Sequence, residues 1–227
     1  INYLITGDFV EKREKWEVVE PKLINGMGVL YRFSENIDPT LEDIELVLFT
    51  SGTTSIPKAV MLTFTNVYSN VVAISDYLQL QSSDKILLIK NMCHSSTVVG
   101  ELLTGLFKGC TIYLTRTTPF AQETLRIIND NKITVFFSVP TILRALVHLL
   151  LSKKIEMSTL RVLNFYGAST SEQLIEDAIK VLPRCNLMYS YGLTEASPRV
   201  TYISMKDWKH KKGSSGKPIE GVGVFIV

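Results

Sequence analysis

The chain has 227 residues, of which 46% are hydrophobic, 20% charged and 9% aromatic. This balance is typical of a globular protein with a substantial core and excludes an intrinsically disordered chain. Lysine and arginine number 24 against 22 aspartates and glutamates, and the resulting formal net charge of +2 argues against a nucleic-acid or membrane-surface partner.

Between residues 46 and 190, short apolar segments rich in β-branched residues alternate with amphipathic stretches of helical length. The expected strands are 46–49, 86–89, 111–114, 134–137, 162–165 and 186–189. The expected helices are 66–78, 97–107, 121–129, 140–151 and 171–182. Apolar strands separated by helices are typical of α/β proteins, so we expect a mostly parallel sheet covered by helices on both faces.

The two ends of the chain do not follow this alternation. We divide the sequence into a preceding segment, 1–45, an α/β subdomain, 46–198, and the start of a β-rich segment, 199–227. The chain begins without an initiator methionine or a signal-peptide pattern, so we expect it to be part of a longer protein. Its longest apolar run, 145–151, is far shorter than the ~20 residues of a membrane-spanning helix, and no transmembrane segment is expected.

Ligands bind at the carboxyl ends of the strands in such sheets, and three turns at these positions have an unusual composition. The first, residues 50–59, carries five hydroxyl side chains, one glycine and Lys58. Hydroxyls and backbone N–H groups can surround phosphate oxygens, while the lysine adds a mobile positive charge. It is not a Walker A loop, because Pro57 replaces the second glycine and Ala59 lacks the hydroxyl. A Ser/Thr-rich surface turn has the same composition, so the residues alone leave both interpretations open.

The second turn, 189–195, brings together an aromatic ring, a glycine, a hydroxyl and a carboxylate, which suit a purine, a phosphate and a divalent metal. In the third turn, 166–169, small residues would let a flat ring lie against the backbone. The alternative is a tight strand-to-helix turn with Ser169 or Ser171 as the helix N-cap.

In this order and spacing, the turns resemble the adenylate-forming superfamily, which includes acyl-CoA synthetases, coumarate-CoA ligases, luciferases and amino-acid adenylation domains. Residues 50–59 are similar to its TSGTTGxPKG signature, 167–169 to its second adenine-contacting turn and 191–195 to its YGxTE motif. Residues 213–218 match the GSxGxP stretch that follows. The resemblance covers roughly 46–227 and implies part of the large N-terminal domain of such an enzyme.

The resemblance also implies roles for individual residues. Lys58 and the neighbouring hydroxyls would hold the β- and γ-phosphates of ATP, Thr194 would contact the α-phosphate, and Glu195 would bind Mg²⁺. Tyr191 would stack on adenine, and His94 would lie beside the substrate carboxylate, although unaided we would expect a buried or capping histidine. The implied nucleotide-binding residues are Thr50, Ser51, Gly52, Thr53, Thr54, Lys58, Gly167, Ala168, Ser169, Tyr191, Gly192 and Thr194.

The reaction implied is attack of a carboxylate on the α-phosphate of MgATP, which gives acyl-AMP and pyrophosphate, followed by acyl transfer to the thiol of coenzyme A or of a carrier protein. Its expected catalytic residues are Lys58, Thr194, Glu195 and His94. Amino-acid-activating members carry an Asp beside the position of His94, whereas Ser95 follows it here, which favours an acid without an α-amino group.

Some expected parts of such an enzyme differ or are not found. Ser55 and Ala59 stand where the family has glycine, and a side chain at a position that needs a positive φ costs about 1–2 kcal/mol. Thr6-Gly7-Asp8 has the letters of the family's [ST]GD motif but stands at the wrong end of the chain. We expect the motif itself and the C-terminal lid domain to lie beyond Val227, and therefore expect this chain to be inactive alone. We expect the acyl pocket to draw on Val98, Val99, Leu102 and the turn 137–140.

Two alternatives stay open: a nucleotide-binding domain of this fold without turnover, and an adenylation domain acting on amino acids or carrier proteins. An α/β hydrolase is disfavoured because the sequence has no G-x-S-x-G elbow. Cys93, Cys110 and Cys185 are widely spaced, which argues against disulfides or zinc and favours a reducing, cytoplasmic location. We expect Cys93 to lie in the core rather than to act as a nucleophile.

Overall fold

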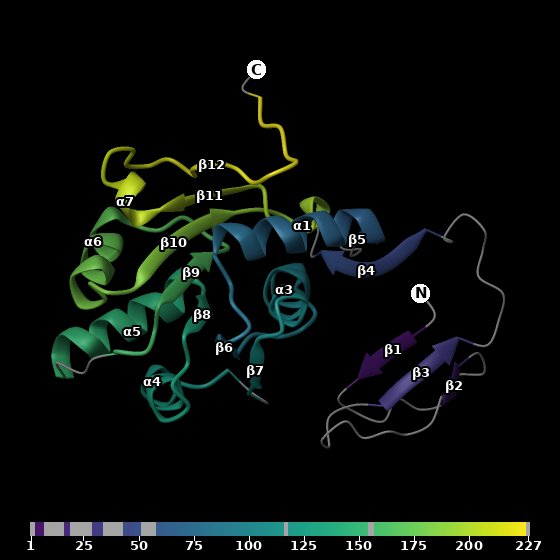
Figure 1. Ribbon diagram of the computed structural model, residues 1–227, viewed down its shortest axis with the longest axis horizontal. Helices are drawn as coiled ribbons and strands as arrows, with labels where there is room; N and C mark the ends of the chain where they lie inside the picture. The colour runs from purple at the N-terminus through teal and green to yellow at the C-terminus, as the bar shows by residue number, and fades with distance from the viewer. Residues whose placement is uncertain are drawn as a thin grey trace. The chain divides into compact units, whose positions relative to one another are not determined.

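The computed structural model describes the backbone of residues 3–6, 16–18, 29–33, 43–50, 58–115, 118–153 and 157–225, with side chains from residue 43 onward. The chain forms two compact units, residues 1–64 and 65–227 (Figure 1). Each unit is described by itself below.

The first unit contains a small three-stranded sheet and a separate hairpin. In the sheet, β1 (Tyr3–Thr6) and β2 (Trp16–Val18) flank β3 (Val29–Phe33), and both pairs are antiparallel. The hairpin consists of β4 (Ile44–Thr50) and β5 (Lys58–Thr63), which also pair antiparallel.

The hairpin corrects one expectation. The strand expected at 46–49 exists, but it pairs with β5 and is not part of the parallel sheet. A strand inside a parallel sheet is buried on both faces, whereas β4 keeps Glu45 exposed and leaves Phe49 68% exposed. The short connection 51–57 also suits a hairpin better than a crossover, which needs a dozen or more residues.

The second unit is built on a seven-stranded sheet with the order β12-β11-β10-β9-β8-β6-β7 (Figure 1). Its strands are β6 (Lys85–Leu88), β7 (Thr111–Leu114), β8 (Val135–Ser138), β9 (Val162–Tyr166), β10 (Asn186–Tyr191), β11 (Thr201–Ser204) and β12 (Lys217–Pro218). The five strands from β10 to β7 run parallel, and β11 and β12 extend that sheet antiparallel at one edge.

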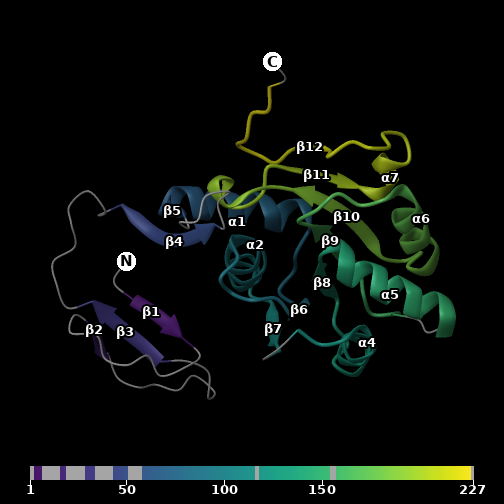
Figure 2. The same ribbon diagram turned by 180° about the vertical axis from the view of Figure 1, so that it is seen from behind.

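Helices lie on both faces of this sheet, as the α/β interpretation predicts (Figure 2). The helical segments are α1 (Phe64–Tyr77), α2 (Ser95–Thr97), the π-helical turn η2 (Val98–Leu103), α3 (Thr104–Phe107), α4 (Ala121–Asp130), α5 (Pro140–Lys153), α6 (Glu172–Val181), the 3-10 turn η3 (Thr194–Ala196) and α7 (Met205–Trp208). The helix expected at 97–107 is therefore a π-helical turn flanked by two short α-helices.

Side chains alternate between two hydrophobic clusters along each central strand, because successive residues of a strand point to opposite faces. On β8, Phe136 packs with α4, α5 and α6, whereas Val135 and Phe137 pack on the other face with α1. Every residue of β8 and β9 is buried, which explains why these strands are mostly apolar, with Ser138 and Asn164 as buried polar residues. None of the described helices combines the length and apolar character needed to cross a membrane.

Candidate functional site

Two of the three unusual turns are neighbours at the carboxyl end of the parallel sheet. Strands β9 and β10 pair in parallel, and their register sets Tyr166 directly opposite Ser190. The turn that begins at Gly167 therefore leaves the sheet beside the turn that begins at Tyr191. Gly167 has a φ of +94°, a left-handed conformation that favours glycine. Ligand sites of open α/β sheets lie at this end of the strands.

The segment that follows β6 joins the same site. The hydroxyl of Ser95, at the start of α2, donates to the Thr194 hydroxyl oxygen over 3.2 Å. Ser95 is only 5% exposed, and His94 immediately before it is exposed as the N-cap residue of α2. Thr194 begins η3, and Glu195 beside it is exposed. The structure thus brings His94, Thr194 and Glu195 to one edge of the sheet.

The side chains around these turns have differing exposure. Tyr191 is 47% exposed, and Ala168 and Ser169 are also exposed. Of the two proposed helix caps, Ser171 is the N-cap of α6, because its hydroxyl oxygen accepts a hydrogen bond from the backbone N–H of Leu174 at 3.4 Å. Gly167, Ala168 and Ser169 precede this cap and are all exposed, so their turn is accessible from solvent.

Gly192 has a structural reason to be glycine. A Cβ atom at this position would lie 1.7 Å from the backbone oxygen of Pro198, which no side chain could tolerate. The glycine lets residues 192 and 198 approach each other within the connection between β10 and β11. This close contact holds η3 against the following strand, independently of any ligand.

Asn70 on α1 fixes the other side of the same connection, and the sequence analysis did not identify it. Its side-chain amide donates to the backbone oxygens of Ala196 and Arg199, each at 3.0 Å, and its carbonyl accepts from the backbone N–H of Arg199 at 3.1 Å. Asn70 is only 4% exposed. A single buried amide therefore holds the backbone that follows Thr194 and Glu195.

A second feature missed in the sequence is a buried charged cluster at this edge, formed by Lys90, Glu101, Tyr166 and Arg199. Lys90 forms an ion pair with Glu101 and donates to the hydroxyl of Tyr166, which in turn donates to Glu101. Glu101 is fully buried inside the π-helical turn η2. Such turns are frequent at functional sites, and a glutamate within an apolar run was the available sequence signal.

Burial sets the titration of this cluster. Removal from water raises the pKa of Glu101 and lowers the pKa of Lys90, while their mutual attraction opposes both shifts. The Arg199 guanidinium carbon lies 3.7 Å from the centre of the Tyr166 ring, within range of a cation–π contact. These contacts fix the side chain of Tyr166, the residue that precedes Gly167.

The first unusual turn lies in the other unit. Thr50 and Lys58 face each other across the β4–β5 hairpin, and Lys58 is exposed. Ala59 lies in the extended strand β5 and its φ is not positive. Its side chain therefore does not cause the backbone strain that the sequence analysis considered at this position. The remaining residues expected to bind phosphates, Ser51, Gly52, Thr53 and Thr54, and also Ser55, lie outside the described residues.

Cys93 corrects another expectation. It is exposed rather than in the core, because it belongs to the turn between β6 and α2, where its N–H donates to the side chain of Asn91 at 3.0 Å. A separate cavity of about 730 Å³ lies beside Asn186 at the amino end of β10, opposite the unusual turns. It is lined by Cys185 and Tyr77 among others and contains none of the expected site residues.

Comparisons with known proteins show what the chain is similar to. The chain matches the AMP-binding enzymes over residues 4–227. It is 32% identical to the 2-succinylbenzoate–CoA ligase of Bacillus licheniformis over 188 residues, which are 82% of this chain and 37% of that protein. It is 31% identical to a feruloyl-CoA synthase of an Amycolatopsis species over 179 residues, 78% of this chain and 36% of that protein. The chain spans little more than a third of these relatives.

The chain is also similar to solved structures of CoA synthetases. The chain resembles the o-succinylbenzoate CoA synthetase of Bacillus subtilis in complex with ATP and magnesium, with a TM-score of 0.69 and 26% identity over 77% of this chain and 35% of that one. The same enzyme with its acyl-adenylate intermediate gives a TM-score of 0.68 and 27% identity over 77% of this chain and 34% of that one.

Proposed function

We propose, from the premise that the chain belongs to the AMP-binding enzyme family, that it carries the nucleotide-binding part of an enzyme that activates a carboxylic acid with ATP and transfers the acyl group to coenzyme A. The observation that supports this most is that the turns after β6, β9 and β10 meet at one sheet edge. Strand register sets Tyr166, before Gly167, opposite Ser190, before Tyr191, and the Ser95–Thr194 hydrogen bond joins the segment that contains His94.

The nucleotide would bind along the two turns that follow β9 and β10. The exposed ring of Tyr191 offers a face on which adenine can stack, and the small residues Gly167, Ala168 and Ser169 leave space beside it. Thr194 would then contact the α-phosphate. Lys58 and the loop from Thr50 onward would hold the β- and γ-phosphates.

In the first step, a carboxylate oxygen of the acid forms a bond with the α-phosphorus, and the bond from that phosphorus to pyrophosphate breaks. In the second, the thiolate sulfur of coenzyme A bonds to the acyl carbon and AMP leaves. Two anions must meet in the first step, so catalysis consists of neutralising charge and aligning the groups. His94 would orient the acid, while Lys58 and Thr194 would stabilise the charge on the phosphates.

The residues present fit a magnesium ion. Mg²⁺ prefers oxygen ligands and is held in nucleotide sites by one or two carboxylates together with phosphates and water. Glu195 presents one exposed carboxylate next to Thr194, and no group of three or more His, Cys, Asp or Glu side chains forms a complete metal cage among the described residues. When bound, the ion supplies positive charge to the phosphate oxygens.

The finer parts of the assignment follow from the same residues. Ser95, rather than an acidic residue, follows His94, which supports an acid without an α-amino group. The three cysteines are free, which supports a cytoplasmic location. Because the chain spans about a third of its relatives, we also propose that acyl-adenylate formation needs residues outside these 227.

Acid-dependent exchange of labelled pyrophosphate into ATP tests the proposal on the full-length protein. Fatty, aromatic and dicarboxylic acids are compared with amino acids, and hydroxylamine trapping identifies the activated acid. We expect exchange that requires both magnesium and a carboxylic acid, followed by acyl-CoA formation when coenzyme A is added.

The alternatives give different results in this experiment. Exchange with amino acids alone, or transfer only to a carrier-protein thiol, would indicate the amino-acid adenylation type. AMP binding without exchange for any acid would indicate a nucleotide-binding domain without turnover. Ala59 no longer favours that second alternative, because the residue is unstrained in β5.

A further inference from the structure

The cavity at the amino end of β10 has no role in the proposed function. Its volume of about 730 Å³ is within the range of about 300–1,000 Å³ that is typical of small-molecule sites. The start of β10, the end of α6 and α7 border it, and α6 and α7 lie beside each other at this side of the sheet (Figure 1). The cavity is at the opposite end of β10 from Tyr191 and lies entirely within the second unit.

The interior of this cavity is largely apolar. Four lining side chains are apolar and at most 5% exposed: Leu182, Leu187, Met188 and Met205. Tyr77 and Tyr202 form a further wall, with their rings stacked at 4.4 Å between centres and 12° between planes. Methionine side chains adapt to ligands of differing shape. An apolar group that enters this cavity is therefore removed from water, which favours binding.

The charged side chains that line the cavity are all basic. They are Arg184, Lys206 and Lys209, and each is exposed. Lys206 and Lys209 are three residues apart on α7 and its C-cap, so they lie on the same face of that helical turn. A smaller cavity of about 270 Å³ shares the segment Leu182–Cys185 with the first, and its charged lining residues, Lys180 and Arg184, are basic too. Positive charge is thus concentrated around an apolar interior.

This positive charge is not compensated by the protein. Among the described residues, none of the three lining cations forms an ion pair or a side-chain hydrogen bond. The nearby carboxylates of α6, Glu172 and Glu176, pair with Lys212 at 3.2 and 2.7 Å. Asp207 on α7 accepts a hydrogen bond from the Ser204 hydroxyl at 2.9 Å. The cations of the cavity are therefore available to an anion from solution.

The thiol in the cavity wall does not change this balance. Burial raises the pKa of Cys185 to about 12, so the group stays neutral at physiological pH and adds no negative charge. The cavity therefore combines a neutral, apolar interior with a basic rim. A ligand that matches both parts has an apolar body and an anionic group at one end.

We propose that this cavity binds a soluble phosphate monoester with an apolar body, at a site separate from the nucleotide and acid sites. A phosphate monoester carries about −1.5 to −2 charges at pH 7 and three acceptor oxygens, so it can use several cationic donors at once. The Arg184 fork and the point charges of Lys206 and Lys209 suit such a group better than a single negative charge. The apolar body would occupy the space between Met188 and Met205. The inference goes beyond the proposed function and does not depend on it.

Titration calorimetry on the full-length protein tests the inference with four probes and no substrate present. Octyl phosphate has both parts of the expected ligand, octyl sulfate has the same body with one charge, inorganic phosphate has only the anion, and octanol has only the apolar body. We expect octyl phosphate to bind at one site and tighter than octyl sulfate. Inorganic phosphate and octanol should bind at least about tenfold more weakly than octyl phosphate, because each makes only part of the contacts.

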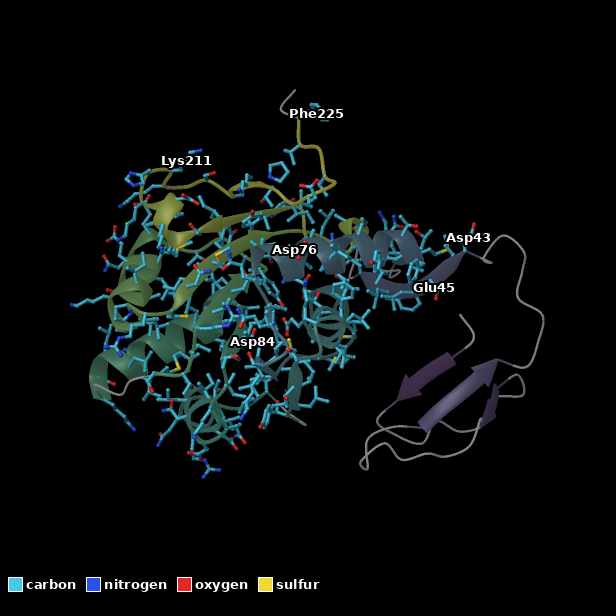
Figure 3. All side chains as sticks on the ribbon, in the orientation of Figure 1. Asp43, Glu45, Asp76, Asp84, Lys211 and Phe225 are labelled. Carbon is cyan, nitrogen blue, oxygen red and sulfur yellow. The ribbon has the colours of Figure 1, made fainter. Side chains whose placement is uncertain are left out.

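Substitutions of exposed cations locate the site. Arg184→Met and Lys209→Met each remove a charge that lines the cavity and should weaken octyl phosphate binding about threefold to tenfold. Lys211→Met is the matched control, because Lys211, labelled in Figure 3, is exposed on the same basic turn but does not line the cavity. It should leave the affinity unchanged. Since all three residues are exposed, these variants should fold as the wild type does.

Other outcomes would overturn the inference. An equal loss in Lys211→Met would show a general attraction of anions to the basic turn, and equal affinities for octyl phosphate and inorganic phosphate would show that the apolar interior is not used. Displacement of octyl phosphate by AMP would place it in the nucleotide site. Tighter binding to vesicles of phosphatidylcholine and phosphatidic acid than to octyl phosphate would assign the basic residues to a lipid surface. No binding of octyl phosphate would also overturn it, and none of these results bears on acid activation.

Discussion

Asn70 and Arg199 are 129 positions apart in the sequence, yet the side chain of one binds both the backbone N–H and the backbone oxygen of the other. The same amide also binds the oxygen of Ala196 at 3.0 Å. Residues 196–199 follow directly on Thr194 and Glu195. Helix α1 therefore positions the connection that carries the expected α-phosphate and magnesium ligands.

Asn70→Ala should lower the free energy of unfolding by about 3 kcal/mol, because the buried backbone N–H and oxygen of Arg199 and the partly buried oxygen of Ala196 lose this partner. Asn70→Asp keeps the acceptor but places a carboxylate against two carbonyl oxygens, so it should also be destabilising. Urea unfolding measures both, with Asn186→Asp at the exposed start of β10 as the control. A loss in Asn70→Ala no larger than in the control would show that the clamp contributes little to stability.

Lys58→Ala should weaken ATP binding far more than AMP binding, because the lysine is expected to face the outer phosphates. Titration calorimetry with both nucleotides on the full-length protein measures the difference, and Lys180→Ala on the exposed surface of α6 is the matched control. An equal loss for ATP and AMP, or no loss, would contradict the assignment of the loop between β4 and β5.

Tyr191→Ala should cost about 1–3 kcal/mol of nucleotide affinity, by analogy with base–aromatic stacking, whereas Tyr191→Phe should cost little. The ring of Tyr191 is half exposed, so neither change disturbs the core. Affinity for AMP measured by calorimetry separates the two. If phenylalanine is as damaging as alanine, the hydroxyl rather than the ring face is what matters.

Asp84, which is labelled in Figure 3, makes stability depend on pH. Burial raises the pKa of Asp84, but hydrogen bonds from Arg161, the Gln81 N–H and Thr134 outweigh it and hold the pKa below its usual value. A carboxyl with a lowered pKa in the folded state contributes stability above its unfolded pKa of about 4 and loses it as the pH falls further.

Asp84→Asn should therefore lower the free energy of unfolding at about pH 7 by about 1–3 kcal/mol. We expect the lower part of this range, because Arg161 is 35% exposed and water screens its attraction to Asp84. The difference from the wild type should shrink between about pH 4 and pH 2. Urea unfolding across this range tests the sign, and a difference that stays constant with pH would rule out the linkage.

The cysteines should differ in reactivity. Cys93 is exposed in the turn before His94, whereas burial raises the pKa of Cys185 to about 12 and also raises the pKa of the buried Cys110. Since the thiolate is the reactive form, a thiol reagent should modify Cys93 first in the native protein. Mass spectrometry locates the label. A carboxylic acid bound beside His94 should slow the modification of Cys93. Equal labelling of Cys185 would contradict the buried environment.

The sequence alone determined the alternation of strands and helices in the second unit and the place of its unusual turns. Periods of two and of about 3.6 residues are local properties, so strands such as 162–165 and helices such as 121–129 can be recognised from their own residues. Their order then predicts a parallel sheet with its ligand site at one edge.

Only the tertiary structure decided which distant residues meet. Strand β4 pairs with β5 rather than with the parallel sheet, and this depends on burial that an apolar run does not reveal. The Asn70 clamp and the cluster around Glu101 and Arg199 join side chains from different elements of the fold. Hydrogen bonding and charge compensation between buried polar groups are set by position in space, and no local pattern in the chain encodes that position.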